Sequence, residues 1–203
     1  FDSEIVGAKN TDLNEVRTKV DEFIDVAKDI LLFLKHISSI KVSHIGESGT
    51  MTTSAHFSSA KEPSVSEKES ATTFNMRLES KTKACSPAQI DHFKVAKSQA
   101  EDPSSGRKAE GAVAINMRHF ETGQTEKGKI YVGLPLKENS IQPVHINGNF
   151  ALDHGRNGLL AGSSWNKTVM STAVSSAYLQ LLESVKRDLQ ALQDEKKLSW
   201  IRL

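Results

Sequence analysis

The chain has 203 residues, with 26 Lys and Arg against 25 Asp and Glu and a formal net charge of +1. This near balance of charge gives no electrostatic reason to expect a nucleic-acid partner. The length is sufficient for one domain with a substantial core or for two small ones, and we predict a single domain over residues 1–203.

Cysteine content and hydrophobicity exclude further classes of protein. Cys85 is the only cysteine, so an intramolecular disulfide and a cysteine-based zinc site are both impossible. A lone cysteine also fits a reducing compartment. The richest apolar run, residues 30–34, is too short to span a bilayer, and no signal peptide is visible. Because the chain starts at Phe1 and stops just after Trp200, we expect it to be a piece of a longer protein.

Residues 11–37 are predicted to form a long amphipathic helix. Asn10 or Thr11 could cap its first turn. At 1.5 Å per residue the helix would be roughly 40 Å long, which is enough to lie across a whole sheet. Its apolar face would consist of Leu13, Val16, Val20, Phe23, Ile24, Ala27, Ile30, Leu31 and Leu34.

The middle of the chain is typical of strands joined by polar segments. Strands are predicted at residues 40–45, 51–57, 72–79, 92–96 and 111–117. Residues 58–71 and 97–110 are polar and each contains a proline, which predicts two loops. Residues 121–128 are predicted to form a hairpin loop.

In the stretch 129–166, glycines, prolines and other turn-forming residues interrupt the apolar runs more than elsewhere in the sequence. Residues 130–136 predict a buried strand that a glycine and a proline interrupt. A polar turn is predicted at 137–140 and a short strand at 144–146. The Asn-Gly pair at 147–148 is typical of a turn.

A second long helix is predicted over residues 165–195. It follows a loop at 153–158 that contains two glycines and one arginine, and Ser164 could cap its start. Its apolar face would consist of Val169, Ala173, Ala177, Tyr178, Leu181, Leu182, Val185, Leu189 and Leu192.

These elements together predict an α/β protein of the α+β kind. The sheet would be mixed and largely antiparallel, and two long amphipathic helices would cover it. Because each helix has one apolar stripe, the simplest packing places both helices on one face of the sheet.

The sequence lacks the signatures of several enzyme classes. It contains no GxxxxGKS or GxGxxG phosphate loop and no GxSxG elbow. Asp153, His154 and Ser163 are not spaced as a triad, because adjacent residues such as the first two diverge on most backbones. His145, Asp153 and His154 match no standard metal site. We therefore predict no metal site and no enzyme activity for this chain alone.

Arg156 is the candidate functional residue. It lies between Gly155 and Asn157, in a loop that follows a predicted buried strand. A guanidinium on such a loop is suited to binding a phosphate or carboxylate in a neighbouring domain. The alternative is a surface arginine that pairs locally with Asp153.

Several short motifs occur together near this arginine. They are Leu134-Pro135-Leu136, Pro143-Val144-His145-Ile146-Asn147-Gly148, Phe150-Ala151-Leu152-Asp153, Arg156 and Trp165-Asn166. With residues 3–5 and 31–37 near the start of the chain, this layout resembles the internal repeats of sacsin, often called SIRPT repeats. The resemblance is specific around residues 134–166 and weak between about 48 and 125.

The resemblance implies a function within a larger assembly. In that family an ATPase domain of the ninety-kilodalton heat-shock chaperone type precedes the segment, which would be a middle domain that couples it to client or co-chaperone binding. ATP and magnesium would bind to the preceding domain, and this segment would hold no cofactor. Arg156 would then be a trans-domain arginine for the γ-phosphate. The resemblance further implies a cytoplasmic regulator of the seventy-kilodalton heat-shock chaperone system, without membrane insertion.

Two positions depart from the family pattern. Asn157 stands where a second arginine is frequent, and Leu160 stands where an aromatic residue is common. If the arginine pair acts on nucleotide, this copy would be weakened. The competing hypothesis is a protein-interaction scaffold without nucleotide dependence, which would present an exposed apolar patch or groove.

Overall fold

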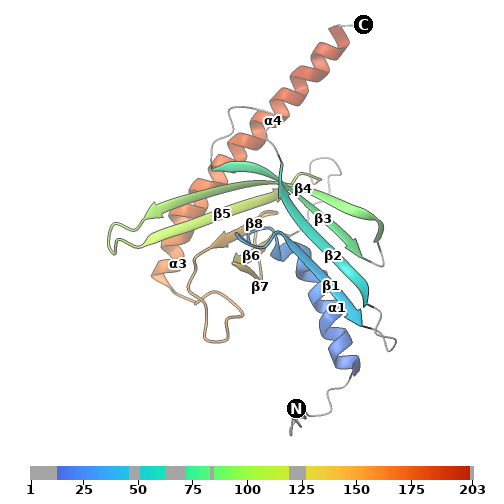
Figure 1. The fold of residues 1–203 in the computed structure, drawn as a ribbon. Helices are drawn as coiled ribbons and strands as arrows, with labels where there is room; N and C mark the ends of the chain where they lie inside the picture. The colour runs from blue at the N-terminus through green and yellow to red at the C-terminus, as the bar shows by residue number, and fades with distance from the viewer. Residues whose placement is uncertain (1–12, 46–50, 63–71, 83–84, 119–126, 202–203) are drawn as a thin grey trace.

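The computed structural model describes residues 13–45, 51–62, 72–82, 85–118 and 127–201. They form the predicted α+β fold, with one mixed, mostly antiparallel sheet of eight strands and helices toward both ends of the chain (Figure 1). The strands are β1 (Ser39–Ile45), β2 (Met51–Lys61), β3 (Thr73–Thr82), β4 (Cys85–Glu101), β5 (Lys108–Asn116), β6 (Lys129–Val132), β7 (Leu134–Asn139) and β8 (His145–Gly148). The helices are α1 (Leu13–Ile30), α3 (Ser164–Val169), the π-helical turn η1 (Met170–Val174) and α4 (Ser175–Ile201).

The order of strands in the sheet is β1-β2-β3-β4-β5-β8-β6-β7. Neighbouring strands are antiparallel, except for β6 and β8, which are parallel. Because β8 lies between β5 and β6, the predicted hairpin loop at residues 121–128 is wrong, and this connection crosses over instead. Residues 119–126 of the connection lie outside the described part of the chain.

The predicted loop at 58–71 begins inside a strand. β2 continues to Lys61, whose register partner on β3 is Met76. The prediction at 51–57 therefore placed the end of this strand too early. Residues 63–71, the rest of the predicted loop, lie outside the described residues.

The predicted loop at 97–110 is also mostly strand. β4 and β5 pair up to Glu101 and Lys108, so that only residues 102–107 connect them. The polar composition was misleading because ladder hydrogen bonds satisfy the backbone whatever the side chains are. Side chains near this hairpin are largely exposed to solvent, and they need not be apolar.

Residues 130–136 form a hairpin and not a single buried strand. β6 and β7 pair in antiparallel fashion around Gly133, whose φ of 73° is the left-handed conformation that glycine adopts without strain. The polar turn predicted at 137–140 is mostly the second half of β7, which ends at Asn139.

The Asn-Gly pair at 147–148 lies within β8 and does not form the predicted turn. Asn147 and Gly148 pair with Ala112 and Gly111 of β5. A Cβ at Gly148 would overlap the ring of Phe150. The glycine therefore serves close packing and not a reversal of the chain.

The first helix is shorter than predicted, because α1 ends at Ile30. The three residues that follow, Leu31, Leu32 and Phe33, are all buried. Consecutive side chains on a helix point 100° apart, so one helical stripe cannot bury all three, whereas a turn can. Consequently α4 is the one long helix among the described elements, and the prediction of two long helices is wrong in this respect.

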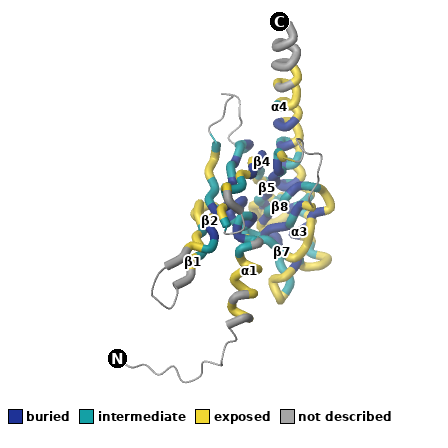
Figure 2. Tube along the Cα trace, turned by 90° about the vertical axis from the view of Figure 1, so that its right-hand side faces the viewer, coloured by how far each residue is buried: buried dark blue, intermediate teal, exposed yellow. Residues whose placement is uncertain are grey.

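The two helical segments lie on opposite faces of the sheet, contrary to the predicted packing on one face. Successive residues of β5 belong to different core clusters: Val113 packs with the α3–η1–α4 segment, and Ala112 and Ala114 pack with α1. In Figure 2, α1 lies between β1–β2 and β7, with α4 beyond the sheet. Both faces of β5 are therefore core, which explains its run of small apolar residues.

The C-terminal helical segment starts at α3 and runs through η1 into α4. The side chain of Ser163, and not that of Ser164, accepts the capping hydrogen bond from the N–H of Asn166. The helical period predicted the buried stripe in part. Val169, Ala173, Ala177, Leu181 and Val185 are buried, whereas Leu182 and Leu189 of the same predicted face are 46% and 39% exposed. After Val185, every side chain whose exposure is described is exposed or half-buried.

Candidate functional site

The loop that carries Arg156 has a defined backbone. Arg156 has a φ of 53°, and its N–H donates to the carbonyl of Asp153 at 3.1 Å. The N–H of Asn157 donates to Oδ1 of Asp153 at 3.0 Å, and the N–H of Asp153 donates to the carbonyl of Gly158 at 3.0 Å. The Asp153 side chain thus supports the turn that presents Arg156.

Glu138 on β7 holds the far end of this loop. Its Oε1 accepts from the N–H of Leu159 at 3.0 Å. The same carboxylate lies against Gly158, where a Cβ would overlap it. The sequence offered no signal for this role, because Glu138 lay in a predicted polar turn.

The side chain of Arg156 is exposed. Within the residues that the structure describes, no ion pair joins it to Asp153, which was the alternative considered from the sequence. The guanidinium is therefore presented to solvent on a supported loop. This geometry allows it to contact a group on another domain or molecule.

Most of the other motif residues connect neighbouring elements through hydrogen bonds. Oδ1 of Asn147 accepts from the N–H of Gly133 at 2.9 Å and so ties β8 to the β6–β7 turn. Nδ1 of His145 accepts from the N–H of Lys129 at 3.3 Å and lies 3.2 Å from the hydroxyl of Tyr131. Leu134 is 56% exposed on β7, next to the half-buried Pro135.

Trp165 and Asn166 join the start of α3 to the segment that follows β8. Nε1 of Trp165 donates to the carbonyl of Asn149 at 2.8 Å. The Asn166 side chain accepts from the N–H of Ala151 at 2.7 Å and donates to its carbonyl at 2.9 Å. Phe150, between these two points, is buried in the core.

Two further residues of this region make contacts that the sequence motifs did not indicate. The guanidinium of Arg107 lies 3.8 Å from the ring centroid of Trp165, a cation–π contact between the β4–β5 connection and the start of α3. The side chain of Asn149 accepts from the N–H of Glu110 and donates to the carbonyl of Lys108. Asn149 lies two residues after Asn147, and this strand period was a usable signal that both face the same side.

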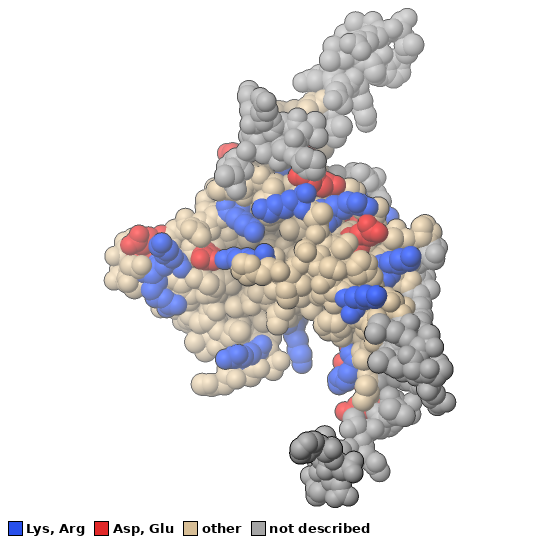
Figure 3. Space-filling model, in the orientation of Figure 1, with Lys and Arg blue, Asp and Glu red and all other residues tan. Residues whose placement is uncertain are grey.

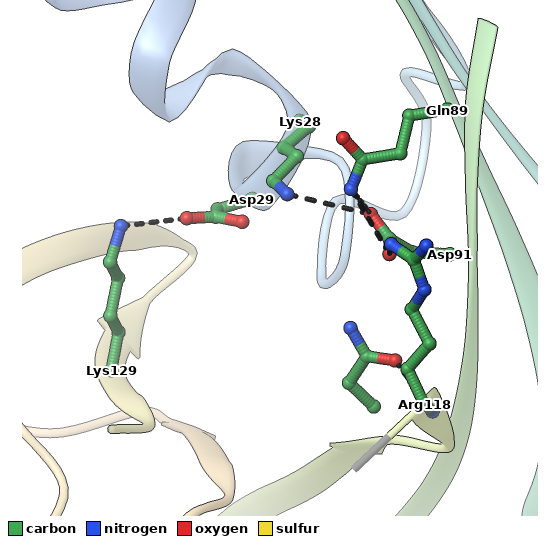
Figure 4. Close-up of polar contacts among 7 residues, drawn as sticks. Lys28, Asp29, Gln89, Asp91, Arg118 and Lys129 are labelled. Atoms are coloured by element: carbon green, nitrogen blue, oxygen red, sulfur yellow. Dashed lines mark hydrogen bonds and ion pairs between the residues drawn. The ribbon is translucent and has the colours of Figure 1, made fainter. Parts of the chain in front are cut away.

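A second group of polar residues connects α1 to the sheet (Figure 4). Asp91 is 3% exposed and lies 3.4 Å from Nζ of Lys28 and 3.5 Å from Nη1 of Arg118. Lys129 and Asp29 form a separate pair at 2.7 Å. These pairs fix the C-terminal end of α1 against β4 and β6.

Tyr131 lies beside this charged group and is fully buried. Burial, followed by the nearby Asp29 carboxylate, raises the pKa of Tyr131 well above its ordinary value. The phenol is therefore neutral at physiological pH, and its ring contacts Phe33 at 4.9 Å between centroids. This arrangement stabilises the fold and offers no nucleophile.

The described residues contain no group of three or more His, Cys, Asp and Glu side chains arranged to hold a metal ion. His145 and Asp153, which were considered as ligands, instead bond to the groups given above. Within the same residues, none of the helices combines the length and the apolar character needed to cross a membrane.

Comparison with known proteins gives one informative similarity. The chain is 38% identical to human sacsin over 84 residues, a match that covers 38% of this chain and 2% of sacsin. No protein-family model matches the chain. No solved structure matches it significantly. The chain therefore contains a segment related to sacsin, and it spans a very small part of that protein.

Proposed function

We propose that this chain is the middle domain of a sacsin-type internal repeat and that it couples an adjoining ATPase domain to client or co-chaperone binding. Two lines of support are independent of each other. One is the sequence similarity to human sacsin. The other is the supported loop that presents the side chain of Arg156 to solvent.

The exposed guanidinium carries the mechanistic part of this proposal. An arginine that enters a nucleotide site from a neighbouring domain neutralises charge on the transferring phosphoryl group. Arg156 has the requirements for this role, because its loop is fixed by Asp153 and Glu138 while its side chain is exposed. The nucleotide and magnesium would bind to the preceding domain, and this domain would supply one group.

Steady-state ATP hydrolysis tests the proposal in a protein that contains this domain together with its own preceding domain. Arg156→Ala should lower kcat by about a thousandfold, the low end of the effect of such arginines. Arg156→Lys should restore little activity, because an ammonium lacks the planar fork. Arg187→Ala, at an exposed position on α4, is the matched control and should leave the rate unchanged.

A scaffold without nucleotide dependence is the second candidate function. A groove between α1 and β1 favours it, since Val16, Val20 and Phe23 are 44%, 38% and 40% exposed and Ile40 and Val42 form its opposite wall. Exposed apolar side chains in one groove are typical of protein-binding surfaces. Absence of ATP hydrolysis by the folded two-domain protein would support this candidate. If Arg156→Ala hydrolyses ATP as fast as the wild type, Arg156 has no part in the mechanism.

We further propose that the parent protein acts in the cytoplasm as a regulator of the seventy-kilodalton heat-shock chaperone system. The similarity to sacsin supports this part of the proposal. Refolding of a denatured reporter enzyme by that chaperone system, with and without the two-domain protein, tests it. An unchanged refolding yield would contradict it.

A further inference from the structure

A cavity of about 410 Å³ opens inside the curve of the sheet, beyond the C-terminal end of α1. Its walls come from the segment after α1, from β4, β5, β6 and β8, and from the turn between β6 and β7. Phe33 and Ala112, which belong to the core cluster on the α1 side, form an apolar floor. The cavity is separate from the Arg156 loop, no residue of which lines it.

Three lysines gather at this cavity. Lys35 and Lys97 line it, and Lys61 is close enough to Lys97 for their charges to repel. Nζ of Lys61 and Nζ of Lys97 lie 4.4 Å and 5.1 Å from the ring centroid of Phe74. Figure 3 shows that Lys and Arg side chains also occupy more of the viewed face of the molecule than Asp and Glu do.

Lys97 lies in this lining without an acidic partner among the described side chains. It is half-buried, and none of the described acidic side chains forms an ion pair with it. Burial, and then repulsion from Lys61 and Lys35, lower the pKa of Lys97 below its ordinary value. A bound anion would offset both of these unfavourable effects.

The one acidic residue among the described lining residues is Glu110. Its Oε2 lies 3.5 Å from Nζ of Lys35, with the two side chains 44% and 67% exposed. An ion pair this exposed is weak and can open at small cost. The lining therefore keeps an excess of positive charge, and Lys61 adds to it.

Asn147 adds a neutral donor to the same wall. Its Oδ1 accepts the N–H of Gly133, which assigns the side-chain nitrogen as the donor end of the amide. The wall thus combines ammonium groups with an amide N–H above an apolar floor. Such a combination is typical of sites for small anionic molecules.

We propose that this cavity binds the phosphate group of a small organic phosphate, with Lys97 and Lys35 contacting the phosphate oxygens and Phe33 and Ala112 packing against the organic part. Phosphate is favoured over carboxylate because an ammonium is a compact point charge that suits phosphate, whereas planar carboxylates are matched best by arginine. No arginine lines the cavity among the described residues. The inference is independent of the similarity to sacsin.

Titration with phenyl phosphate, followed by NMR of lysine side chains labelled with carbon-13, tests the proposal. The Lys97 signals should shift in a saturable manner, and the pKa of Lys97 should rise toward its ordinary value as the anion binds. Inorganic phosphate should bind to the same lysine more weakly, because it lacks the apolar body. Benzoate, the carboxylate of similar size, should bind more weakly than phenyl phosphate.

Lys97→Gln should weaken phenyl phosphate binding by about tenfold, as expected for one charge-assisted contact. Lys35→Gln should weaken it by about threefold, because Lys35 is more exposed. Lys137→Gln, which removes an exposed charge on β7 outside the cavity, is the matched control and should have no effect.

Circular dichroism establishes that each variant is folded. Because Lys35 is largely exposed, its variant keeps the test valid even if Lys97→Gln impairs folding. Saturable shifts confined to surface lysines outside the cavity would overturn the proposal. So would an affinity that Lys97→Gln and Lys35→Gln leave unchanged, or tighter binding of benzoate than of phenyl phosphate.

Discussion

Three asparagine side chains between residues 147 and 166 bond to backbone groups and not to one another. Asn147 binds the β6–β7 turn, Asn149 binds β5, and Asn166 binds both the N–H and the carbonyl of Ala151. An amide can serve both kinds of backbone group at once, since it carries a donor and an acceptor. This capacity explains why asparagine occurs at these positions, where a backbone N–H or carbonyl of a neighbouring segment needs a partner.

Asn166→Ala should destabilise the domain by about 2–4 kcal/mol, because it leaves two backbone groups of Ala151 without their partners in a partly buried place. It also removes the bond to the carbonyl of Leu160. Urea unfolding, monitored by tryptophan fluorescence, measures the change. Ser171→Ala, on an exposed part of the same helical segment, should change stability much less, and equal effects of the two variants would contradict the prediction.

Tyr131 should make stability depend on pH in the alkaline range. Its pKa is raised in the folded state, so the unfolded chain loses the phenolic proton first as the pH rises. The contribution is fully present below the unfolded pKa of about 10, and above that value the free energy of unfolding falls by up to about 1.4 kcal/mol per pH unit. Lysine side chains titrate in the same range, so a matched comparison is needed.

The comparison uses Tyr131→Phe and Tyr178→Phe, which each remove one of the two tyrosines of the chain. Unfolding by urea is measured between pH 8 and pH 11 for the wild type and both variants. We expect a shallower loss of stability only for Tyr131→Phe. Parallel curves for all three proteins would show that Tyr131 does not titrate differently in the two states.

At the scale of elements, β5 and η1 approach one another unusually closely at Gly111. A Cβ at this position would lie 2.6 Å from backbone atoms of Ala173 and Val174. Backbone cannot move aside as the end of a flexible side chain can. The absence of a side chain at Gly111 therefore sets the distance between the C-terminal helical segment and the sheet.

Gly111→Ala should accordingly destabilise the domain by about 2–3 kcal/mol, within the range for overpacked sites. Thermal unfolding followed by circular dichroism measures the effect. Gly106→Ala is a poor control because Gly106 has a positive φ. Ser98→Ala, on the neighbouring strand β4, is preferable, and a Gly111→Ala protein as stable as the wild type would show that η1 is free to shift.

The buried residues of the helices could be predicted from the sequence only where one face of the helix is buried. The period of 3.6 residues located the buried residues of the C-terminal segment from Val169 to Val185, although Leu182 and Leu189 of the same predicted face are exposed. It failed at the end of α1, because residues 31–33 are buried by tertiary contacts that no local pattern encodes. The helical period also gave no information on which face of the sheet each helix covers. That depends on how successive side chains of β5 alternate between the two faces of the sheet.

The candidate site was predictable only in part, for a similar reason. The glycines around Arg156 indicated a tight loop, and the structure places Arg156 in a left-handed turn. Glu138 and Arg107 could not have been identified, because their partners Leu159 and Trp165 are brought to them by the packing of distant segments. The cavity lysines likewise come from separate elements, and only the fold brings them together.

At the scale of the whole molecule, burial changes along α4 after residue 185, within the part of the helix whose exposure is described. Among the residues of α4 whose exposure is described, Val185 is the last buried one, and Leu189 is 39% exposed. Figure 1 shows the helix continuing away from the sheet toward the C-terminus. The two halves of α4 should therefore differ in local stability, since most helical stability in proteins comes from packing.

Native-state hydrogen exchange measured by mass spectrometry tests this difference. Peptides from residues 175–185 should exchange at least about a hundredfold more slowly than peptides from residues 186–191, whose side chains are exposed or half-buried. The five strands β1 to β5 provide an internal reference for slow exchange. Uniform protection along α4 would show that the second half is covered in solution.

The place of β8 in the sheet has a consequence for synthesis on the ribosome. Strands β1 to β5 are neighbours in sequence order, so each can pair as soon as it has emerged. The β6–β7 hairpin emerges before β8, yet it joins the sheet only through β8. Because an isolated two-stranded hairpin is marginally stable in water, it cannot join the sheet until residues 145–148 leave the exit tunnel, and the core cluster that includes Trp165 and Leu181 is completed later still. A nascent chain stalled before that point would therefore be a substrate for chaperones, even though most of its strands have already been made.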